Sequence, residues 1–589
     1  MTLTIEKFLN LALEHHRAGR LKEAEALYRQ VLQVQPNHAG ALHCMGVIAY
    51  QLQRFDRAVD YYRRAIRRAP GIAEFHNNLG TAYREKGKLE EAVAQYRQAL
   101  TLQPASAEVY YNLANALKEQ GKLEESVAQY RQALALKQDY IEAYNNLGEA
   151  IRDQGKFEEA VACYRQALAI SPGNAIVHSN LILCMRSQAC DPGALVRELK
   201  TWNDAHVRPL ATAAGVHANV RDAEKPLRVG YVSAGFWGNS ASVLVEPLLA
   251  AHDHTGMGVF VYSNRRYPER TGRSVRKTGN VWRDIAGLSD EAVAKRIAAD
   301  GIDVLIDLSG HAAGNRLLVF ARKPAPVQAT FERTGTTTGL SAMAYRLTDR
   351  YLSPPDSAEW FSEELIRLPG CFVCYRPPEH APAVSPLPAA ASGHVTFGSF
   401  NKLMKVTPSV VALWAEILRA LPTARVILQD RTLADQTQRS RYLDLFAANG
   451  IDKERVEIMA TRASYADHLA LYERVDVGLD PFPYNGCTTT CEALWMGVPV
   501  VTLAGLGSYG RRGGSLLSAI GLTQLIAASP EAYVKIAVDL AKNRKALATL
   551  RAELRLMMAA SPLCDAKAHA RAVEQAYRLM WRRWCERPQ

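Results

Sequence analysis

The 589-residue sequence lacks the features that would place it in a membrane or outside the cell. Its apolar runs all fall short of the roughly 18 residues that a membrane-spanning helix needs. The segment from Met1 to Arg20 mixes charged and apolar residues and has no apolar core of the kind that a secretory signal requires. The ten cysteines are scattered through apolar patterns, which favours reduced thiols. We therefore expect a cytoplasmic protein that does not contact a membrane.

Motifs for metal or nucleic-acid binding are also missing. Cys371 and Cys374 form the only CxxC pair, and no second pair completes the four ligands of a structural zinc site. The formal net charge of +12 suits an acidic partner, but no zinc finger, RNP-like stretch or helix-turn-helix pattern accompanies it. The densest basic patch, Arg63 to Arg68, fits the solvated face of a helix. We expect no metal and no nucleic-acid partner.

What the sequence does contain is a repeat with a period of 34 residues. A small residue and a tyrosine recur where two helices would cross closely, and a proline ends each unit because it cannot continue a helix interior. The three series are Ala24, Ala58, Ala92, Ser126 and Ala160; Tyr28, Tyr62, Tyr96, Tyr130 and Tyr164; and Pro36, Pro70, Pro104, Gln138 and Pro172. The pattern resembles the tetratricopeptide family. It predicts an α-solenoid over residues 1–200, with five full repeats and a degenerate sixth, followed by a linker helix region over 201–225.

An asparagine also recurs at one place in the repeat. The series is Asn78, Asn112, Asn146 and Asn180. A carboxamide both donates to C=O and accepts from N–H, so it can hold a polypeptide backbone with little regard for sequence. The alternative is that asparagine is simply common at this repeat position. In either case the superhelix predicts a polypeptide bound along its groove, and a homodimer through the repeats is a further expectation.

From residue 226 onward, strand-like runs alternate with helical patterns, which predicts an α/β fold. We expect an N-terminal lobe over 226–375, a Pro/Ala-rich linker over 376–393, and a C-terminal lobe with a terminal helix over 394–589. Two Rossmann-like lobes joined by a hinge describe the GT-B architecture, whose ligands bind at the carboxyl ends of the strands. The expected strands are 227–233, 258–263, 303–309, 327–331, 395–400, 425–429, 456–459, 475–479 and 498–503.

The segment from Asp480 to Val500 gives the strongest indication of a ligand site. A buried strand ends in a loop rich in proline and glycine, and three threonines then open a helix. A helix start offers unpaired N–H groups and the positive end of the dipole, which together hold a diphosphate. Thr488 and Thr489 add hydroxyl donors, and Glu492 can accept hydrogen bonds from ribose hydroxyls. The alternative for Thr488 is a simple N-cap.

This loop, with the order of repeats and lobes, resembles the O-GlcNAc transferase family over about residues 5–580. The segment Phe397–Val406 is similar to the family's strand-to-helix turn, whose second basic residue, here Lys405, reaches the donor phosphates. His468 matches the family histidine near the uracil and the phosphates. The resemblance implies that the repeat asparagines clamp the acceptor and that Lys405 and His468 are catalytic, the alternatives being a surface lysine and a structural histidine. The implied donor-binding set is Asn485, Thr488, Thr489, Glu492, Lys405 and His468.

Positions around the sugar depart from the family pattern. Gly235 and Asn239 stand where relatives carry an aspartate and a histidine, and Arg333 begins the segment that replaces the family's Gly-Tyr-Pro-Gly-Thr loop. Because Asn239 cannot take a proton, we expect the proton to pass to a donor phosphate oxygen or to solvent near His311 or His468. The residues expected around the sugar and the acceptor are Asn239, His311, Arg333 and Arg511.

Three functions remain open on these grounds. The first is an inverting, metal-independent protein O-glycosyltransferase that moves a sugar, foremost GlcNAc from UDP-GlcNAc, to Ser or Thr. The second is an enzyme for flagellin or another protein with a different donor, such as a CMP-linked acidic sugar whose carboxylate would meet Arg333, Arg511 and Arg512. The third is a catalytically silent adaptor that binds protein through its repeats. The nucleotide sugar is expected as a co-substrate, with no cofactor.

Overall fold

The computed structural model divides into two compact units. The first comprises residues 1–154 and 165–170, and the second comprises 155–164 and 171–589. The structure describes residues 4–187, 192–211, 217–236, 242–265, 279–331, 335, 337–357, 359–460 and 464–587.

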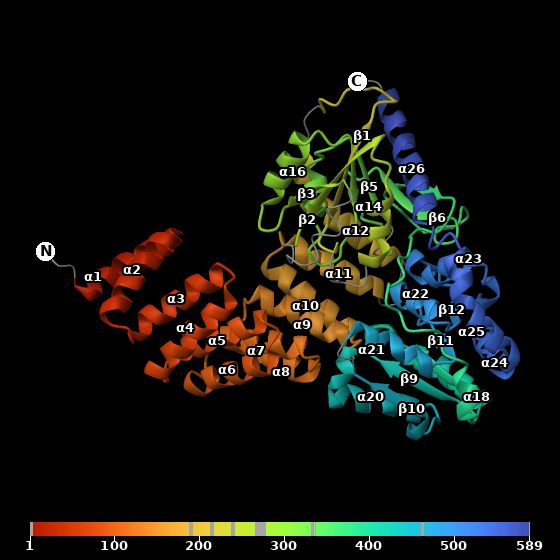
Figure 1. Ribbon diagram of the computed structural model, residues 1–589, viewed down its shortest axis with the longest axis horizontal. Coiled ribbons are helices and arrows are strands. Elements are labelled where there is room, and N and C mark those ends of the chain that lie inside the picture. Colours follow the sequence, from red (N-terminus) through yellow and green to blue (C-terminus); the bar gives the residue numbers. More distant parts are fainter. Residues whose placement is uncertain are drawn as a thin grey trace. The chain divides into compact units, whose positions relative to one another are not determined.

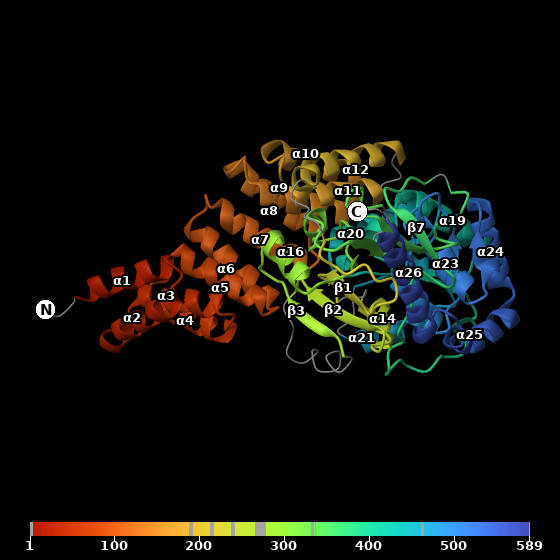
Figure 2. The same cartoon turned by 90° about the horizontal axis from the view of Figure 1, so that it is seen from above.

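The first unit is built from successive helices that pair as the 34-residue repeat predicts, shown from red to orange in Figures 1 and 2. Helices of 13 and 14 residues alternate through it. The tetratricopeptide expectation is confirmed. The helices are α1 (Ile5–Arg17), α2 (Leu21–Val34), α3 (Ala39–Gln51), α4 (Phe55–Arg68), α5 (Ala73–Glu85), α6 (Leu89–Leu102), α7 (Ala107–Glu119), α8 (Leu123–Leu136), α9 (Ile141–Asp153) and the end of α10 (Phe157–Ile170).

A second small position of the repeat, occupied by Gly46 and Gly80 on the first helix of a pair, is explained by the tyrosine of the following helix. A Cβ atom added to Gly46 would lie 2.6 Å from the Cε1 atom of Tyr62, and one added to Gly80 would lie 2.8 Å from Cε1 of Tyr96. Tyr62 and Tyr96 are buried, with 2% and 0% of their surface exposed. Each ring therefore needs a residue without a side chain beneath it, because protein interiors are close-packed.

Within the described part of the second unit, the first sheet has seven parallel strands in the order β3-β2-β1-β4-β5-β6-β7. The expected strands at 227–233, 258–263, 303–309 and 327–331 are present, while β3, β6 and β7 were not expected. Their sequences VWRD, YRLTD and ELIRL carry charged residues that hid the strand pattern. The strands are β1 (Leu227–Ser233), β2 (Met257–Ser263), β3 (Val281–Asp284), β4 (Val304–Asp307), β5 (Val327–Phe331), β6 (Tyr345–Asp349) and β7 (Glu364–Leu368).

Helices that precede and follow the two lobes in the sequence cover the first sheet. Ile182 of α11 (Ala175–Ser187) and Trp202 of α12 (Pro192–His206) pack in a core with Val232 of β1. These helices thus belong to the second compact unit, although the sequence boundary of the solenoid was drawn at residue 200. At the other end, α26 (Ala566–Glu586) buries Tyr577 and Trp581 against the first sheet, although the sequence grouped it with the second lobe. Other helical segments among the described residues of this lobe are α13 (Arg208–Ala211), η1 (Ser242–Leu244), α14 (Glu246–Ala251), α16 (Asp290–Ala299) and α17 (Leu317–Ala321).

The second sheet has six parallel strands in the order β10-β9-β8-β11-β12-β13. All five strands expected for this lobe are present, and the two-residue β13 was too short to expect. Two parallel-sheet lobes after a helical array confirm the predicted fold class. The strands are β8 (Thr396–Ser399), β9 (Arg425–Gln429), β10 (Val456–Met459), β11 (Val477–Leu479), β12 (Val500–Leu503) and β13 (Ile526–Ala527).

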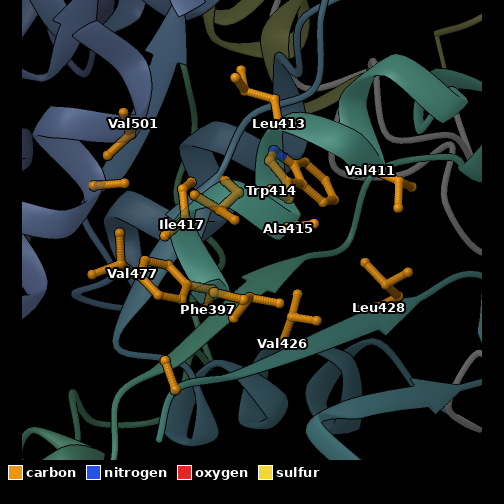
Figure 3. Packing of buried hydrophobic residues seen from close by; sticks show 14 of the residues in the cluster. Phe397, Val411, Leu413, Trp414, Ala415, Ile417, Val426, Leu428, Val477 and Val501 are labelled. Carbon is orange, nitrogen blue, oxygen red and sulfur yellow. The ribbon is translucent and has the colours of Figure 1, made fainter. Parts of the chain in front are cut away.

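Trp414 of α19 (Pro408–Ala420) is central to the core of the second lobe. Its side chain is fully buried and belongs to the same apolar cluster as Phe397 of β8 and Val477 of β11 (Figure 3). The indole Nε1–H donates to the hydroxyl of Tyr533 at 3.1 Å. The expected linker 376–393 contains one short helix, α18 (Pro388–Ser392), whose Ala389 joins this core. Parallel strands with covered faces leave their carboxyl ends for ligands.

Candidate active site

The loop after β11 is closed by a buried carboxylate. Asp480, with 1% of its surface exposed, accepts from the N–H of Gly486 at 2.6 Å and from the hydroxyl of Thr502 on β12 at 2.7 Å. Burial raises the pKa of Asp480 to about 6. Within the loop, the side-chain amide of Asn485 donates to the carbonyl of Pro481 at 3.0 Å. These bonds fix the chain that leads into the threonine helix.

Helix α22 (Thr488–Trp495) begins at the first of the three threonines, as predicted. The N-cap is Cys487 and makes no side-chain capping bond, so Thr488 is the first helical residue and not the N-cap. Thr488 and Thr489 are partly exposed, and the hydroxyl of Thr489 donates to Asn401 after β8 at 3.0 Å. The first N–H groups of a helix have no intrahelical acceptor and carry the positive end of its dipole. This end of α22 can therefore receive an anion.

Lys405 lies against the same loop. It ends the short helix η2 (Leu403–Lys405), and its Nζ donates to the carbonyl of Asn485 at 2.8 Å. The same ammonium lies 4.0 Å from the centre of the Tyr484 ring, an arrangement worth about 2 kcal/mol when desolvated. Burial lowers the pKa of Lys405. The structure thus brings together two separately predicted elements, the basic turn after β8 and the loop before α22.

Two arginines also face Tyr484, and neither belongs to the donor-binding set that the sequence predicts. The guanidinium carbon of Arg186, on α11, lies 4.6 Å from the ring centre, and that of Arg512, on α23 (Arg512–Ala519), lies 5.7 Å from it. Burial by itself would raise the pKa of Tyr484, but Arg186, Lys405 and Arg512 bring it down to about 6. Arg186 lies far from Tyr484 in the sequence, on a helix that continues the repeat pattern. No feature of the sequence therefore indicated that it belongs to the site.

Glu492 and His468 form a second polar group beside α22. His468, on α21 (Tyr465–Ala470), approaches the Glu492 carboxylate at 3.3 Å through Nε2 and the Gln429 side chain at 3.0 Å through Nδ1. The other carboxylate oxygen of Glu492 accepts from the hydroxyl of Tyr465 at 2.8 Å. Glu492 is 4% exposed, so any ribose hydroxyl would share its oxygens with these partners. The two residues lie together, as the predicted donor site requires.

His311 occupies a different environment from the one expected. Its ring is fully buried, with Nδ1 at 3.0 Å from the hydroxyl of Ser179 and Nε2 at 2.8 Å from the carbonyl of Thr338. Burial lowers the pKa of His311 to about 4. The histidine joins α11 to the first lobe, and its burial removes it from a solvent-facing acceptor site.

Arg511 is likewise held by the protein itself. Its Nη2 pairs with Glu359 at 2.7 Å, and its Nε donates to the carbonyl of Leu352 at 2.8 Å. Glu359 also accepts from the N–H of Ser508 at 2.8 Å. Arg511 therefore connects the two lobes, which removes the reason to assign it to a sugar carboxylate. Asn239 and Arg333 lie outside the described residues.

The repeat asparagines contact the preceding repeat. The amide nitrogen of Asn78 lies 2.8 Å from His43, that of Asn112 donates to Asn77 at 3.0 Å, and that of Asn146 donates to Asn115 at 2.9 Å. These three are partly exposed. Asn180 differs, because it is 4% exposed and belongs to the second unit. A shared acceptor-binding role for all four stays a prediction.

Among the residues that the structure describes, no group of three or more His, Cys, Asp or Glu side chains could hold a metal ion. None of the helices described is both long and apolar enough to cross a bilayer.

Comparisons with known proteins match both parts of this architecture. Residues 207–377 and 386–573 match the model of glycosyl transferase family 41. Residues 9–71, 61–94, 80–121, 114–151 and 148–181 match tetratricopeptide repeat models.

Curated relatives from plants match more than half of the chain. The probable UDP-N-acetylglucosamine–peptide N-acetylglucosaminyltransferase SPINDLY of Arabidopsis thaliana is 41% identical over 389 residues, which cover 65% of this chain and 42% of that protein. The rice protein of the same name is 42% identical over 372 residues, covering 62% of this chain and 40% of that protein. The chain thus spans less than half the length of these relatives.

One solved structure of another protein is similar to this chain over almost the whole length of that protein's chain. A mutant of the Thermobaculum terrenum O-GlcNAc transferase is 35% identical, with a TM-score of 0.80, covering 87% of this chain and 98% of that one. The family match spans both lobes and contains the loop, the lysine turn and the start of α22. On this evidence the chain belongs to glycosyl transferase family 41, with a tetratricopeptide array preceding its two lobes.

Proposed function

We propose that this protein is a protein O-glycosyltransferase that moves GlcNAc from UDP-GlcNAc to serine or threonine of polypeptide acceptors. The main observation behind the proposal is the hydrogen bond that Lys405 donates to the Asn485 carbonyl at 2.8 Å, next to the start of α22. A fixed ammonium and a helix N-terminus at one place suit a diphosphate leaving group. The names of the plant relatives and of the bacterial structure support the donor and the acceptor class.

The proposed reaction is a single displacement with inversion. The acceptor oxygen forms a bond to the anomeric carbon, and the bond from that carbon to the diphosphate oxygen breaks, with its electron pair leaving on the diphosphate. Lys405 and the N–H groups of α22 stabilise that developing charge, so the step needs no metal. Because His311 is buried and His468 lies against Glu492 and Gln429, we assign the hydroxyl proton to a donor phosphate oxygen.

The repeats are proposed to supply the acceptor site. Tetratricopeptide arrays bind proteins through stacked helix pairs, and Asn78, Asn112 and Asn146 keep partly exposed carboxamides on them. A carboxamide that donates to a neighbouring repeat still has lone pairs for a peptide N–H.

The donor is tested by product mass. The full chain is co-expressed with candidate acceptor proteins, and the purified pair is incubated in parallel with UDP-GlcNAc, GDP-fucose and a CMP-linked acidic sugar. The proposal expects a mass increase of one N-acetylhexosamine, lost in a Lys405→Met variant. A mass increase with another donor alone would reassign the sugar. Nucleotide binding with no mass change and no donor hydrolysis would favour the silent adaptor.

A further inference from the structure

Three cationic side chains, each from a separate element, face the ring of Tyr484. Lys405 comes from η2, Arg186 from α11 and Arg512 from α23, at 4.0, 4.6 and 5.7 Å from the ring centre. Exposed Lys402, just before η2, adds to the positive potential at the ring.

Two further groups act near this ring. The ring of Tyr509 lies edge-on at 6.5 Å, and buried Asp480 acts on Lys405 from the loop before Tyr484. Cations held this close repel one another, and the electron-rich face of an aromatic ring offsets that repulsion. The ring is therefore the common contact that allows the three cations to stay at one place.

We propose that Tyr484 is a positioning residue for the leaving diphosphate: its ring holds Lys405 beside the start of α22 and ties it to Arg186 and Arg512. The inference rests on the proposed function only for the identity of the leaving group. It also extends the catalytic machinery to α11, the helix that follows the last full repeat, through Arg186.

The charge state of Tyr484 follows from its neighbours. With its pKa lowered to about 6, the phenol is ionised at neutral pH and balances the three cations while the donor is absent. A bound diphosphate supplies negative charge of its own, so it raises the pKa of Tyr484 and the phenolate takes up a proton. Donor affinity is then highest below about pH 6 and falls as the pH rises through the pKa of the free protein.

The first test uses the full chain without any donor. A titration of near-ultraviolet tyrosinate absorbance should show one tyrosine ionising at about pH 6, apart from buried tyrosines such as Tyr62, whose pKa is raised. Tyr484→Phe should remove this step, and Arg186→Met should move it to higher pH. Matched controls are Tyr351→Phe and Arg350→Met, because Arg350 lies 4.7 Å over the Tyr351 ring. Superimposable curves for wild type and Tyr484→Phe would overturn the proposal.

The second test measures UDP-GlcNAc binding by calorimetry at low and high pH. Tyr484→Phe keeps the ring but cannot ionise, so it should bind as wild type does at low pH. At high pH it should bind more tightly than wild type, by about tenfold for each unit by which the diphosphate raises the Tyr484 pKa. Tyr484→Ala, which removes the ring, should weaken binding at every pH.

Buffers of different ionisation enthalpy should report proton uptake in wild type and none in Tyr484→Phe. A purely structural tyrosine would weaken binding in both variants without changing the pH profile, and that result would refute the positioning role. Absence of UDP-GlcNAc binding by every variant, with the absorbance step intact, would count against the proposed donor and not against the charge cluster.

Discussion

At the scale of single residues, the site depends on side chains whose surroundings fix their positions or shift their pKa values. Lys405 donates to a backbone carbonyl and faces an aromatic ring, which keeps its ammonium at one place. Asp480 is a buried carboxyl that shapes a loop. His311, in contrast, has lost the accessibility that a proton acceptor needs.

Lys405→Met should lower the turnover of UDP-GlcNAc by about 10²–10³-fold, because it removes a fixed charge that acts on the leaving group. The matched control is Lys402→Met, three residues earlier and exposed, which should cost far less. The rates are measured as UDP release, which chromatography quantifies with and without acceptor. Equal losses in the two variants would mean that the general positive potential matters and the position of Lys405 does not.

Asp480→Asn should change how stability depends on pH. The folded pKa of Asp480, about 6, lies above its ordinary value of 3.8, so the folded protein binds this proton more tightly than the unfolded chain does. The resulting stabilisation is present at low pH and is lost as the pH rises from about 4 to 6, by about 3 kcal/mol. The asparagine variant should not lose it, so its Tm relative to wild type should be higher at pH 8 than at pH 5. An unchanged difference between the two pH values would contradict the assignment.

At the scale of elements, helix ends and strand ends determine where chemistry can occur. The start of α22, the end of η2 and the end of β11 meet at one loop, and α11 and α23 bring the two arginines to it. In the repeat array, the asparagine on every second helix is the element that we propose binds the acceptor.

Replacing Asn78, Asn112 and Asn146 together by alanine should reduce modification of a full-length acceptor by about tenfold or more, since each lost hydrogen bond contributes about 0.5–1.5 kcal/mol. Hydrolysis of UDP-GlcNAc without acceptor should stay unchanged. Asn180 is left intact because it is buried in the second unit. The control set Gln98, Gln132 and Gln166 lies exposed on the partner helices. If both triple variants lose activity equally, the asparagines are only repeat consensus.

At the scale of the whole second unit, the two lobes are joined by a polar contact at Glu359. Glu359 belongs to the first lobe. Its carboxylate accepts from Arg511 at 2.7 Å and from the N–H of Ser508 at 2.8 Å, and both of these residues belong to the second lobe. Burial raises the pKa of Glu359, so the pair matters more than a surface ion pair would.

Arg511→Met should therefore lower the Tm of the full chain by several degrees, since hydrogen bonds to charged groups contribute about 1.5–3 kcal/mol. Glu359→Gln should do the same, and the double variant should lose less than the sum of the two, as a thermal double-mutant cycle measures. UDP-GlcNAc affinity should change little. Strictly additive losses would show that the two residues do not interact.

The sequence by itself determined the repeat array, nine of the strands, and the two segments that meet at the donor site. Those features depend on local periodicity, on a run of three threonines, and on a resemblance carried by contiguous residues. It missed β3, β6 and β7 because charged residues interrupt their patterns, and it gave no sign that His311 is buried or that Arg511 pairs with Glu359, because burial and ion pairing leave no local trace.

Only the tertiary structure decided which charges share a site. Arg186 and Tyr484 are separated by almost three hundred positions in the sequence, yet lie 4.6 Å apart. Long-range proximity follows from how α11 packs on the first lobe and how the two lobes join. The pKa of Tyr484 depends on those distances and on burial, neither of which a single sequence contains.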